Sequence, residues 1–337
     1  MPPCEKKNTS FYEKLQRCQG LDLRDKRGQR HELAIILVGV TLAMLSNRDG
    51  KLSSIYRHLR KHHDKMLEFM DLEPRDCVSR SHLPIVLEKV SVKEFDRLLF
   101  ESYGIKLSKK QRKWFAIDGK ELRGSIEKGA KRGEVVVQVV AHETGKTQSQ
   151  DYYNGRKESE VNIARNLLAE GGLLGQKISL DALHCKPKTL EPIVKAKGIY
   201  LVGLKGNQKE LFKQMQEASQ ELPIKYTSSS EEKGHGRTTL RKYEVYDIEQ
   251  VKKAERWASS KIATLIKVTR RSVEMKTGKE TQETSYYISN QVGKVPELCV
   301  AVRAHWQVEV NNHLRDVTLS EDQLRTKKRM SVNYWQN

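Results

Sequence analysis

The stretch Phe115–Ser125, FAIDGKELRGS, places a carboxylate, a glycine and two basic side chains directly after a short apolar run. The aspartate in it, Asp118, has two interpretations. Asp-Gly is among the commonest dipeptides of tight turns, so the stretch taken alone favours a hairpin turn. The alternative is a strand that carries a catalytic carboxylate to the rim of a sheet. The sequence on either side of the stretch decides between them.

The order of elements around this stretch predicts a ribonuclease-H-like α/β fold. WFAID, EVVVQVVAHE and KTQSQDYYNG indicate three strands of an antiparallel meander. ESEVNIARNLLAEGG then has helical spacing, KISLDAL is β-rich, KTLEPIVKAKG is helical and IYLVGLKGNQ reads as a buried strand. Three strands, a helix, a strand, a helix and a strand make the mixed sheet of a ribonuclease-H-like domain.

Four regions are expected along the 337 residues of the chain. Residues 1–108 read as an all-α region that suits a DNA-contacting module. Residues 109–225 hold the first part of the catalytic domain, which an inserted β region at residues 226–294 interrupts. Residues 295–337 supply a C-terminal helix that completes the domain, followed by a basic tail. In the all-α region the candidate phosphate contacts are Arg57, Arg60, Lys61 and Arg80, although a solvated helix face explains each of them equally well.

The charge of the chain points to a polyanionic partner. Lys and Arg number 62 against 43 Asp and Glu, which gives a formal net charge of +19, and nucleic acid is the usual partner of so basic a protein. A membrane surface is the rival, but the basic residues are spread along the whole chain. The longest apolar stretch, Glu32–Leu45, is shorter than the about 20 residues that cross a bilayer. We therefore expect a buried helix there and no membrane partner.

The N-terminus and the cysteines indicate a cytoplasmic protein. MPPCEKKNTS is charged and lacks the apolar core of a signal peptide. The five cysteines are scattered and form no C-x-x-C pair. Free thiols are therefore expected, and neither a disulfide framework nor a structural zinc site.

Two aspartates are expected at the same edge of the predicted sheet. Asp118 ends the first strand and Asp181, in KISLDALHC, ends the fourth, and these strands are neighbours in a ribonuclease-H-like sheet. Two carboxylates held close together repel each other unless they are protonated or bridged by cations, and hard divalent metals prefer oxygen ligands. The pair therefore predicts a magnesium site.

The C-terminal helical pattern supplies a third carboxylate, Glu309. The pattern runs from Pro296 to about Val317, with an apolar stripe that we expect to pack against the sheet. The stripe consists of Val302, Trp306, Val310, Leu314 and Val317. Glu309 lies on the polar stripe beside it and would point along the rim toward the aspartates.

Three such carboxylates suit phosphodiester cleavage. They can hold two metal ions about 4 Å apart, which activate a water or a 3′-hydroxyl and stabilise the leaving oxygen. On residue types alone, surface carboxylates at strand ends remain the better explanation, because 43 acidic residues offer many such sets.

Six motifs, in order along the chain, resemble those of one family of mobile-element proteins. They are IDGKELRGS, LDALHCK, YLVGLKGNQ, GHGRTTLR, YYIS and HWQVE…H…DV…ED. With them the chain resembles the H-repeat-associated, ISAs-type insertion-sequence transposases. The resemblance implies a DDE triad at Asp118, Asp181 and Glu309 that cuts DNA at the element ends and joins a 3′-hydroxyl to target DNA. It implies Mg²⁺, replaceable by Mn²⁺, and no nucleotide cofactor.

Basic and polar residues of these motifs are implied contacts to DNA phosphates. They are Lys120, Arg123, Lys205, Asn207, His235, Arg237 and Arg241. A solvated charge is the alternative for the lysines and arginines. His184 and Cys185 follow Asp181 and are expected to be packing residues. Because two element ends must be brought together, a homo-oligomer on DNA is expected, in the cytoplasm of a bacterium and on its nucleoid.

The chain departs from the family pattern after Glu309. It is one residue shorter after His313 and lacks a tryptophan there, which turns Asp316 by about 100° on the helix. Thr239 stands where an acidic residue is expected, and the chain ends at Asn337, where the family continues with a further helix. A truncated remnant that only binds DNA is therefore an alternative to an active transposase. A stand-alone nuclease of the same fold, which cleaves without joining, is a third possibility.

Overall fold

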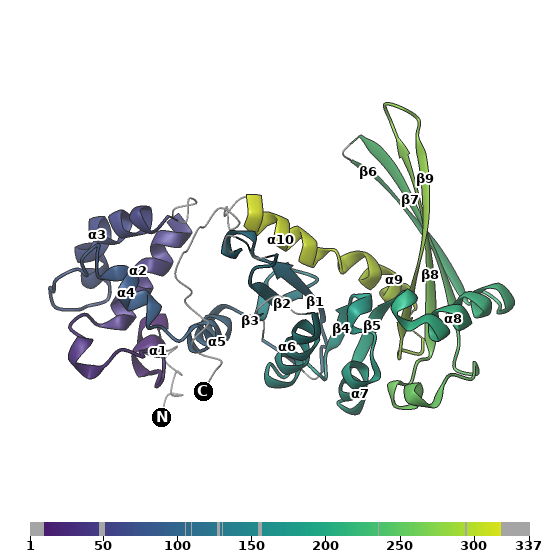
Figure 1. The fold of residues 1–337 in the computed structure, drawn as a ribbon, viewed down its shortest axis with the longest axis horizontal. Coiled ribbons are helices and arrows are strands. Elements are labelled where there is room, and N and C mark those ends of the chain that lie inside the picture. Colours follow the sequence, from purple (N-terminus) through teal and green to yellow (C-terminus); the bar gives the residue numbers. More distant parts are fainter. Residues whose placement is uncertain are drawn as a thin grey trace, which may run out of the picture. The chain divides into compact units, whose positions relative to one another are not determined.

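The chain divides into two compact units, which are described one after the other (Figure 1). The computed structural model describes residues 10–46, 51–104, 106–108, 110–126, 129, 131–153, 157–234, 236–293 and 295–317. The first unit comprises residues 1–105, 121–134 and 312–337, and the second comprises residues 106–120 and 135–311. The division of the chain into four regions by function stays a prediction.

Helices make up the regular structure of the first unit before residue 105, as predicted. They are α1 (Phe11–Arg17), α2 (Leu33–Ser46), α3 (Leu52–Phe69), α4 (Leu83–Glu88) and α5 (Val92–Tyr103), with the short turns η1 (Lys26–Gly28) and, later in the chain, η2 (Arg123–Ser125). α1 begins at a capping box, in which the Ser10 hydroxyl accepts from the Glu13 amide and the Glu13 carboxylate accepts from the Ser10 amide.

The apolar stretch Glu32–Leu45 forms most of α2, which is buried over its first half. Residues Leu33–Leu37 share one core with Leu59 of α3. Gly39 allows α3 this close approach, because a Cβ at that position would lie 2.1 Å from Leu59 Cδ1. The last turn differs from the expectation of a buried helix, since Leu45 is 79% exposed. No helix in the described part of the chain is long and apolar enough to cross a membrane.

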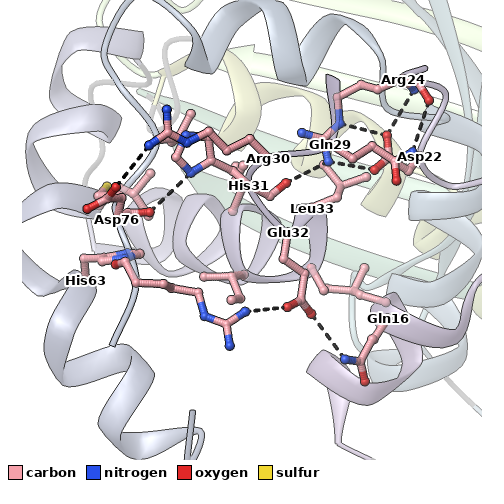
Figure 2. Close-up of a pocket in the computed structure, with 18 of the residues that line it drawn as sticks. Gln16, Asp22, Arg24, Gln29, Arg30, His31, Glu32, Leu33, His63 and Asp76 are labelled. Atoms are coloured by element: carbon pink, nitrogen blue, oxygen red, sulfur yellow. Dashed lines mark hydrogen bonds and ion pairs between the residues drawn. The ribbon is translucent and has the colours of Figure 1, made fainter. Parts of the chain in front are cut away.

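A polar pocket of the first unit lies between α1, α2, α3 and the segment Pro74–Val78 (Figure 2). Its guanidinium groups are paired with carboxylates: Arg24 with Asp22 at 2.7 Å, Arg75 with Glu32 at 2.9 Å and Arg30 with Asp76 at 3.3 Å. These arginines are therefore engaged within the protein. The four predicted phosphate contacts of this region, Arg57, Arg60, Lys61 and Arg80, are all exposed, and their role stays a prediction.

The described part of the second unit holds one mixed sheet in the strand order β3-β2-β1-β4-β5-β9-β8-β7-β6. Its first five strands are β1 (Trp114–Glu121), β2 (Val135–Ala141), β3 (Thr147–Tyr153), β4 (Lys177–Leu180) and β5 (Ile199–Leu204). β1, β4 and β5 run parallel to one another, and β3 runs antiparallel to β2. The order 3-2-1-4-5 confirms the predicted ribonuclease-H-like mixed sheet.

The inserted strands extend this sheet. They are β6 (Tyr226–Gly234), β7 (Arg237–Asp247), β8 (Thr264–Glu274) and β9 (Glu280–Ser289). Residues 286–289 of β9 pair antiparallel with residues 201–204 of β5, and β6 to β8 continue outward as a long antiparallel ribbon (Figure 1). Inserted β structure is confirmed, and backbone hydrogen bonds carry the ladder from β5 into β9.

The helices of the second unit flank the first five strands and follow them. They are α6 (Lys157–Glu170), α7 (Pro187–Lys195), α8 (Lys209–Glu221), α9 (Val295–Ala304) and α10 (Gln307–Val317), with the turns η3 (Ala182–His184), η4 (Gly206–Gln208) and η5 (Glu255–Ser260). In Figure 1, α6 and α10 lie on opposite sides of the strands. Val308 of α10 packs on Ala116 of β1 and Val140 of β2. Because side chains alternate along a strand, Asp118 points to the same face as Ala116, which is the face of α10.

Candidate carboxylate site

The register of β1 and β4 places Asp118 beside Asp181. The last paired residues of the two parallel strands are Ile117 and Leu180, and the two aspartates follow them directly. Neighbouring strands lie about 4.8 Å apart, so the two carboxylates start from adjacent positions on one face. The strand order thus brings together two residues that the sequence separates widely.

The strand β1 continues past Asp118, so two sequence-based expectations are wrong. β1 runs to Glu121, which places Asp118 inside the strand and not at its end. Gly119 does not have the left-handed backbone of a tight turn, so Asp118–Gly119 is not a hairpin turn. The glycine is needed for another reason. A Cβ at position 119 would lie 2.7 Å from Cδ of Glu160 and 2.8 Å from its Oε2, so the absence of a side chain admits the Glu160 carboxyl group.

Electrostatics place Asp118 in a cluster of acidic groups. Burial, together with the nearby charges of Asp181, Glu160 and Glu309, raises the pKa of Asp118 to about 7, against a backbone hydrogen bond from Gly119 that lowers it. Partial burial also raises the pKa of Glu309. The structure therefore brings together the three carboxylates chosen from the sequence and adds Glu160, which the sequence did not single out.

This shift gives the metal-free protein a distinct pH dependence. Asp118 binds its proton more tightly in the folded chain than in the unfolded one, where an aspartate titrates at about 3.9. The protonated carboxyl therefore contributes stability that is complete below about pH 4 and is lost as pH rises to about 7. We expect wild type to lose more stability than Asp118→Asn between pH 4.5 and 8, measured by urea unfolding in EDTA. An equal loss in both proteins would contradict the raised pKa.

Asp181 is fixed by the turn that it begins. Its Oδ1 accepts a hydrogen bond of 2.8 Å from the amide of Leu183, which makes it the N-cap of η3. Its side chain remains 47% exposed, so a second oxygen is open to solvent or to a ligand. The loop after β5 supports the turn: Asn207 Nδ2 donates to the carbonyl of Ala182 at 2.6 Å, and Gln208 Nε2 donates to the carbonyl of Cys185 at 2.8 Å.

Two histidines and a serine connect β4 to the helix that carries Glu309. Ser179 Oγ lies 2.8 Å from His305 Nδ1 and 2.7 Å from His142 Nε2. Burial lowers the pKa of His142 to about 3 and that of His305 to about 4, so both rings are neutral at pH 7. Ser179 thereby links the strand of Asp181 to the turn that precedes α10.

Ser179→Ala is expected to lower the free energy of unfolding by about 1–3 kcal/mol, because it leaves ring nitrogens of His142 and His305 without this buried partner. Urea unfolding would measure the change. Ser229→Ala, at an exposed position of β6, is the matched control and should have little effect. If the two variants lost equal stability, the link would have no energetic role.

The C-terminal helical pattern is broken in the structure, which corrects the predicted buried stripe. α9 ends at Ala304 and α10 begins at Gln307. At this junction the amides of Trp306 and Val308 each donate to the carbonyl three residues earlier in the chain. This tighter turn rotates the following residues, so Val308 is buried at 1% exposure while Trp306 is 43% and Val310 is 56% exposed. Val302 is buried and Val317 is exposed, and the side chain of Leu314 lies outside the described residues. Glu309 follows Val308, and its charge still raises the pKa of Asp118.

The implied DNA contacts lie in varied surroundings. Arg123, Lys205 and Arg237 are exposed, whereas the side chain of Lys120 is buried at 8% exposure. Asn207 holds the loop after Asp181 as described. Arg241 forms an ion pair with Glu232 at 2.8 Å, and the same carboxylate also accepts from Arg303 at 2.6 Å. His235 lies outside the described residues. Contact with DNA stays a prediction for all of them.

His184 and Cys185 are both fully buried, at 0% exposure, as expected of packing residues. His184 nevertheless stands beside the site, with Nε2 at 3.6 Å from Glu160 Oε1 and 4.0 Å from Asp181 Oδ1. In the described part of the chain, no group of three or more His, Cys, Asp or Glu side chains already has the geometry to hold a metal ion. The carboxylates are thus close enough to perturb one another and would have to draw together around an ion.

Comparisons with known proteins identify a family and several relatives of this chain. The family described as "Transposase DDE domain" matches residues 109–333. Two proteins of Escherichia coli strain K12, "Putative protein YbfL" and "H repeat-associated putative transposase YhhI", are each 28% identical over 322 residues, 91% of this chain and 82% of their own. "Putative transposase YncI" of Escherichia coli O157:H7 is 30% identical over 224 residues, 63% of this chain and 56% of its own.

A solved structure of the piggyBac transposase synaptic complex with hairpin DNA also aligns with this chain. The alignment covers 91% of this chain and 68% of the other, at 10% identity and a TM-score of 0.39. The fold assignment rests on the strand order of the protein itself.

Proposed function

Because the chain belongs to the Transposase DDE domain family, we propose that it is a DNA transposase that cleaves phosphodiester bonds at the ends of an insertion sequence and joins a 3′-hydroxyl to target DNA. The observation that carries the proposal is that Asp118 and Asp181 follow adjacent positions of the paired strands β1 and β4. The charge of Glu309 also raises the pKa of the Asp118 carboxyl group. A surface aspartate at a strand end would have no such neighbours.

The proposed catalytic groups are Asp118, Asp181 and Glu309. Their chemistry fits a divalent metal. They are oxygen donors, and burial and neighbouring negative charges raise the pKa of Asp118, a cost that a bound cation would relieve. Mg²⁺, which Mn²⁺ can replace, is the proposed cofactor, with two ions expected. When bound, such ions activate the attacking oxygen and stabilise the leaving one. The protein holds these three carboxylates and fixes them through η3 and the link from Ser179 to His305.

DNA is the proposed partner, consistent with the net charge of +19. Exposed Lys205 and Arg237 in the second unit, and exposed Arg123 in the first, are the proposed phosphate contacts. Buried Lys120 and ion-paired Arg241 are weaker candidates in this conformation. A transposase must hold two element ends at once, so we expect a dimer or larger assembly on DNA, acting at the bacterial nucleoid.

The proposed function is tested with purified protein and supercoiled plasmid that carries the DNA flanking its gene, in Mg²⁺ or Mn²⁺. Cleavage at the element ends followed by joining supports a transposase. Cleavage at unrelated sites without joining supports a nuclease of the same fold. Binding without cleavage in either metal supports a remnant that only binds DNA, and would overturn the proposed reaction.

A further inference from the structure

Glu160 is a fourth carboxylate next to Asp118. It comes from α6, and its carboxyl group occupies the space that a side chain at Gly119 would fill. Tyr153 Oη, at the end of β3, donates to its Oε2 at 2.9 Å. A helix and a strand thus hold this acidic group against the strand that carries Asp118.

His184 lies between Glu160 and Asp181. Its Nε2 is 3.6 Å from Glu160 Oε1 and 4.0 Å from Asp181 Oδ1. The side chain is completely buried, and neither ring nitrogen has a hydrogen-bond partner among the described residues. A buried polar atom without a partner is costly. Two carboxylate oxygens lie within 4.0 Å of Nε2, and a movement of about 1 Å would bring either into hydrogen-bond range.

The charge of Glu160 adds to the crowding around Asp118. A glutamine would accept the same hydrogen bond from Tyr153 without repelling Asp118, whereas the carboxylate adds to the repulsion that Asp181 already exerts there. Gly119 is moreover required to make room for it. A divalent cation bound between these carboxylates would relieve the repulsion.

We propose that Glu160 is a fourth metal-ligating carboxylate of this site, and that His184 is the positioning residue that turns Glu160 and Asp181 toward the metal. The inference rests on the proposed function, because the metal is the one assigned to Asp118 and Asp181. In this role Nε2–H of His184 would donate to one oxygen of a carboxylate while the other oxygen faces the ion. Hydrogen bonds of this kind fix the orientation of metal ligands.

Glu160→Gln tests the ligand directly. The variant keeps the size of the side chain and the acceptor for Tyr153, and it loses the charge. Mn²⁺ binding is followed by the electron paramagnetic resonance signal of the free ion at pH 8, without DNA. We expect affinity to fall by at least about 10-fold. Glu170→Gln, the same change at an exposed position of α6, should bind as wild type. Equal affinity of folded Glu160→Gln and wild type overturns the assignment.

Two variants of His184 separate positioning from packing. Phenylalanine fills the buried space without a donor, whereas glutamine keeps an N–H group near the place of Nε2. We expect His184→Phe to weaken Mn²⁺ binding by about 10-fold or more, and His184→Gln to restore part of it. If both folded variants bind Mn²⁺ equally, the imidazole has only a packing role and this part of the inference is wrong.

Asp118→Asn, in the same titration, separates this inference from the proposed function. If Asp118→Asn binds Mn²⁺ as wild type does, the metal site itself is wrong. If Asp118→Asn loses binding and Glu160→Gln keeps it, the three-carboxylate site stands and only the fourth ligand is overturned.

Discussion

Asp181→Asn is expected to lower the rate of DNA cleavage at least about 1,000-fold without weakening DNA binding. A metal ion stabilises the charge of the reacting phosphodiester by several kcal/mol, and each 1.4 kcal/mol corresponds to about tenfold in rate. Asparagine retains an oxygen that accepts from the Leu183 amide, so the start of η3 is preserved. The loss would therefore report on the missing charge and not on a disturbed turn.

The measurement compares nicking of plasmid that carries the element ends with fluorescence anisotropy of an end oligonucleotide. Asp247→Asn is the matched control, because Asp247 is an exposed residue of β7 whose ion pair is with half-exposed Lys225. It should cleave as wild type. Cleavage by Asp181→Asn at the rate of wild type would remove Asp181 from the chemistry. Loss of both binding and cleavage would instead indicate a misfolded variant.

Gly119→Ala is expected to lower cleavage by about 100-fold or more and the free energy of unfolding by about 1–3 kcal/mol. The added Cβ would overlap the Glu160 carboxyl group, at 2.7 Å from Cδ, and overpacking of this kind forces side chains and backbone to shift. A displacement of about 1 Å at a reacting group costs such a factor in rate. Thermal unfolding and the plasmid assay would measure the two effects.

A second substitution identifies the cause of these losses. Glu160→Ala in the Gly119→Ala background removes the overlap, so stability should recover while cleavage stays low. Gly28→Ala, where an added Cβ meets nothing within 4 Å, is the matched control and should not disturb the sheet. If the double variant were as unstable as Gly119→Ala, the overlap with Glu160 would not be the reason for the glycine.

The sequence was sufficient for the fold class, because element type depends on local periodicity. The strands and helices from Trp114 to Leu204 alternate in the predicted order, and that order determines which strands are neighbours. α8 (Lys209–Glu221) was not predicted. The break between α9 and α10 was also missed, because Val302, Trp306 and Val310 keep helical spacing across it. Packing of Val308 on Ala116 and Val140 sets the rotation of α10, and no local pattern reports such a contact.

The site was partly predictable. Asp118 and Asp181 follow apolar strands, which is a local signal, and Glu309 lies in a helical pattern near the end of the chain. Glu160 gave no such signal, since KESEV resembles any solvated helix start. Its only trace in the sequence is Gly119, a small residue within a strand, which can mark the close approach of another group. A glycine at this position indicates that another group packs closely against the strand, but the sequence does not identify that group as Glu160.

The pairing of β9 with β5 also governs how the protein avoids aggregation. β5 is IYLVGL, an apolar strand buried almost throughout, and as the last strand of a sheet it would offer open backbone groups to another chain. β9 covers that edge, and the sheet instead ends at β6, YTSSSEEKG, whose side chains are largely polar and which carries Glu231, Glu232 and Lys233. A chain shortened by removal of β6 to β9 would expose β5 and self-associate through it. The inserted strands β6 to β9 thus close the apolar edge at β5 and replace it with a polar one.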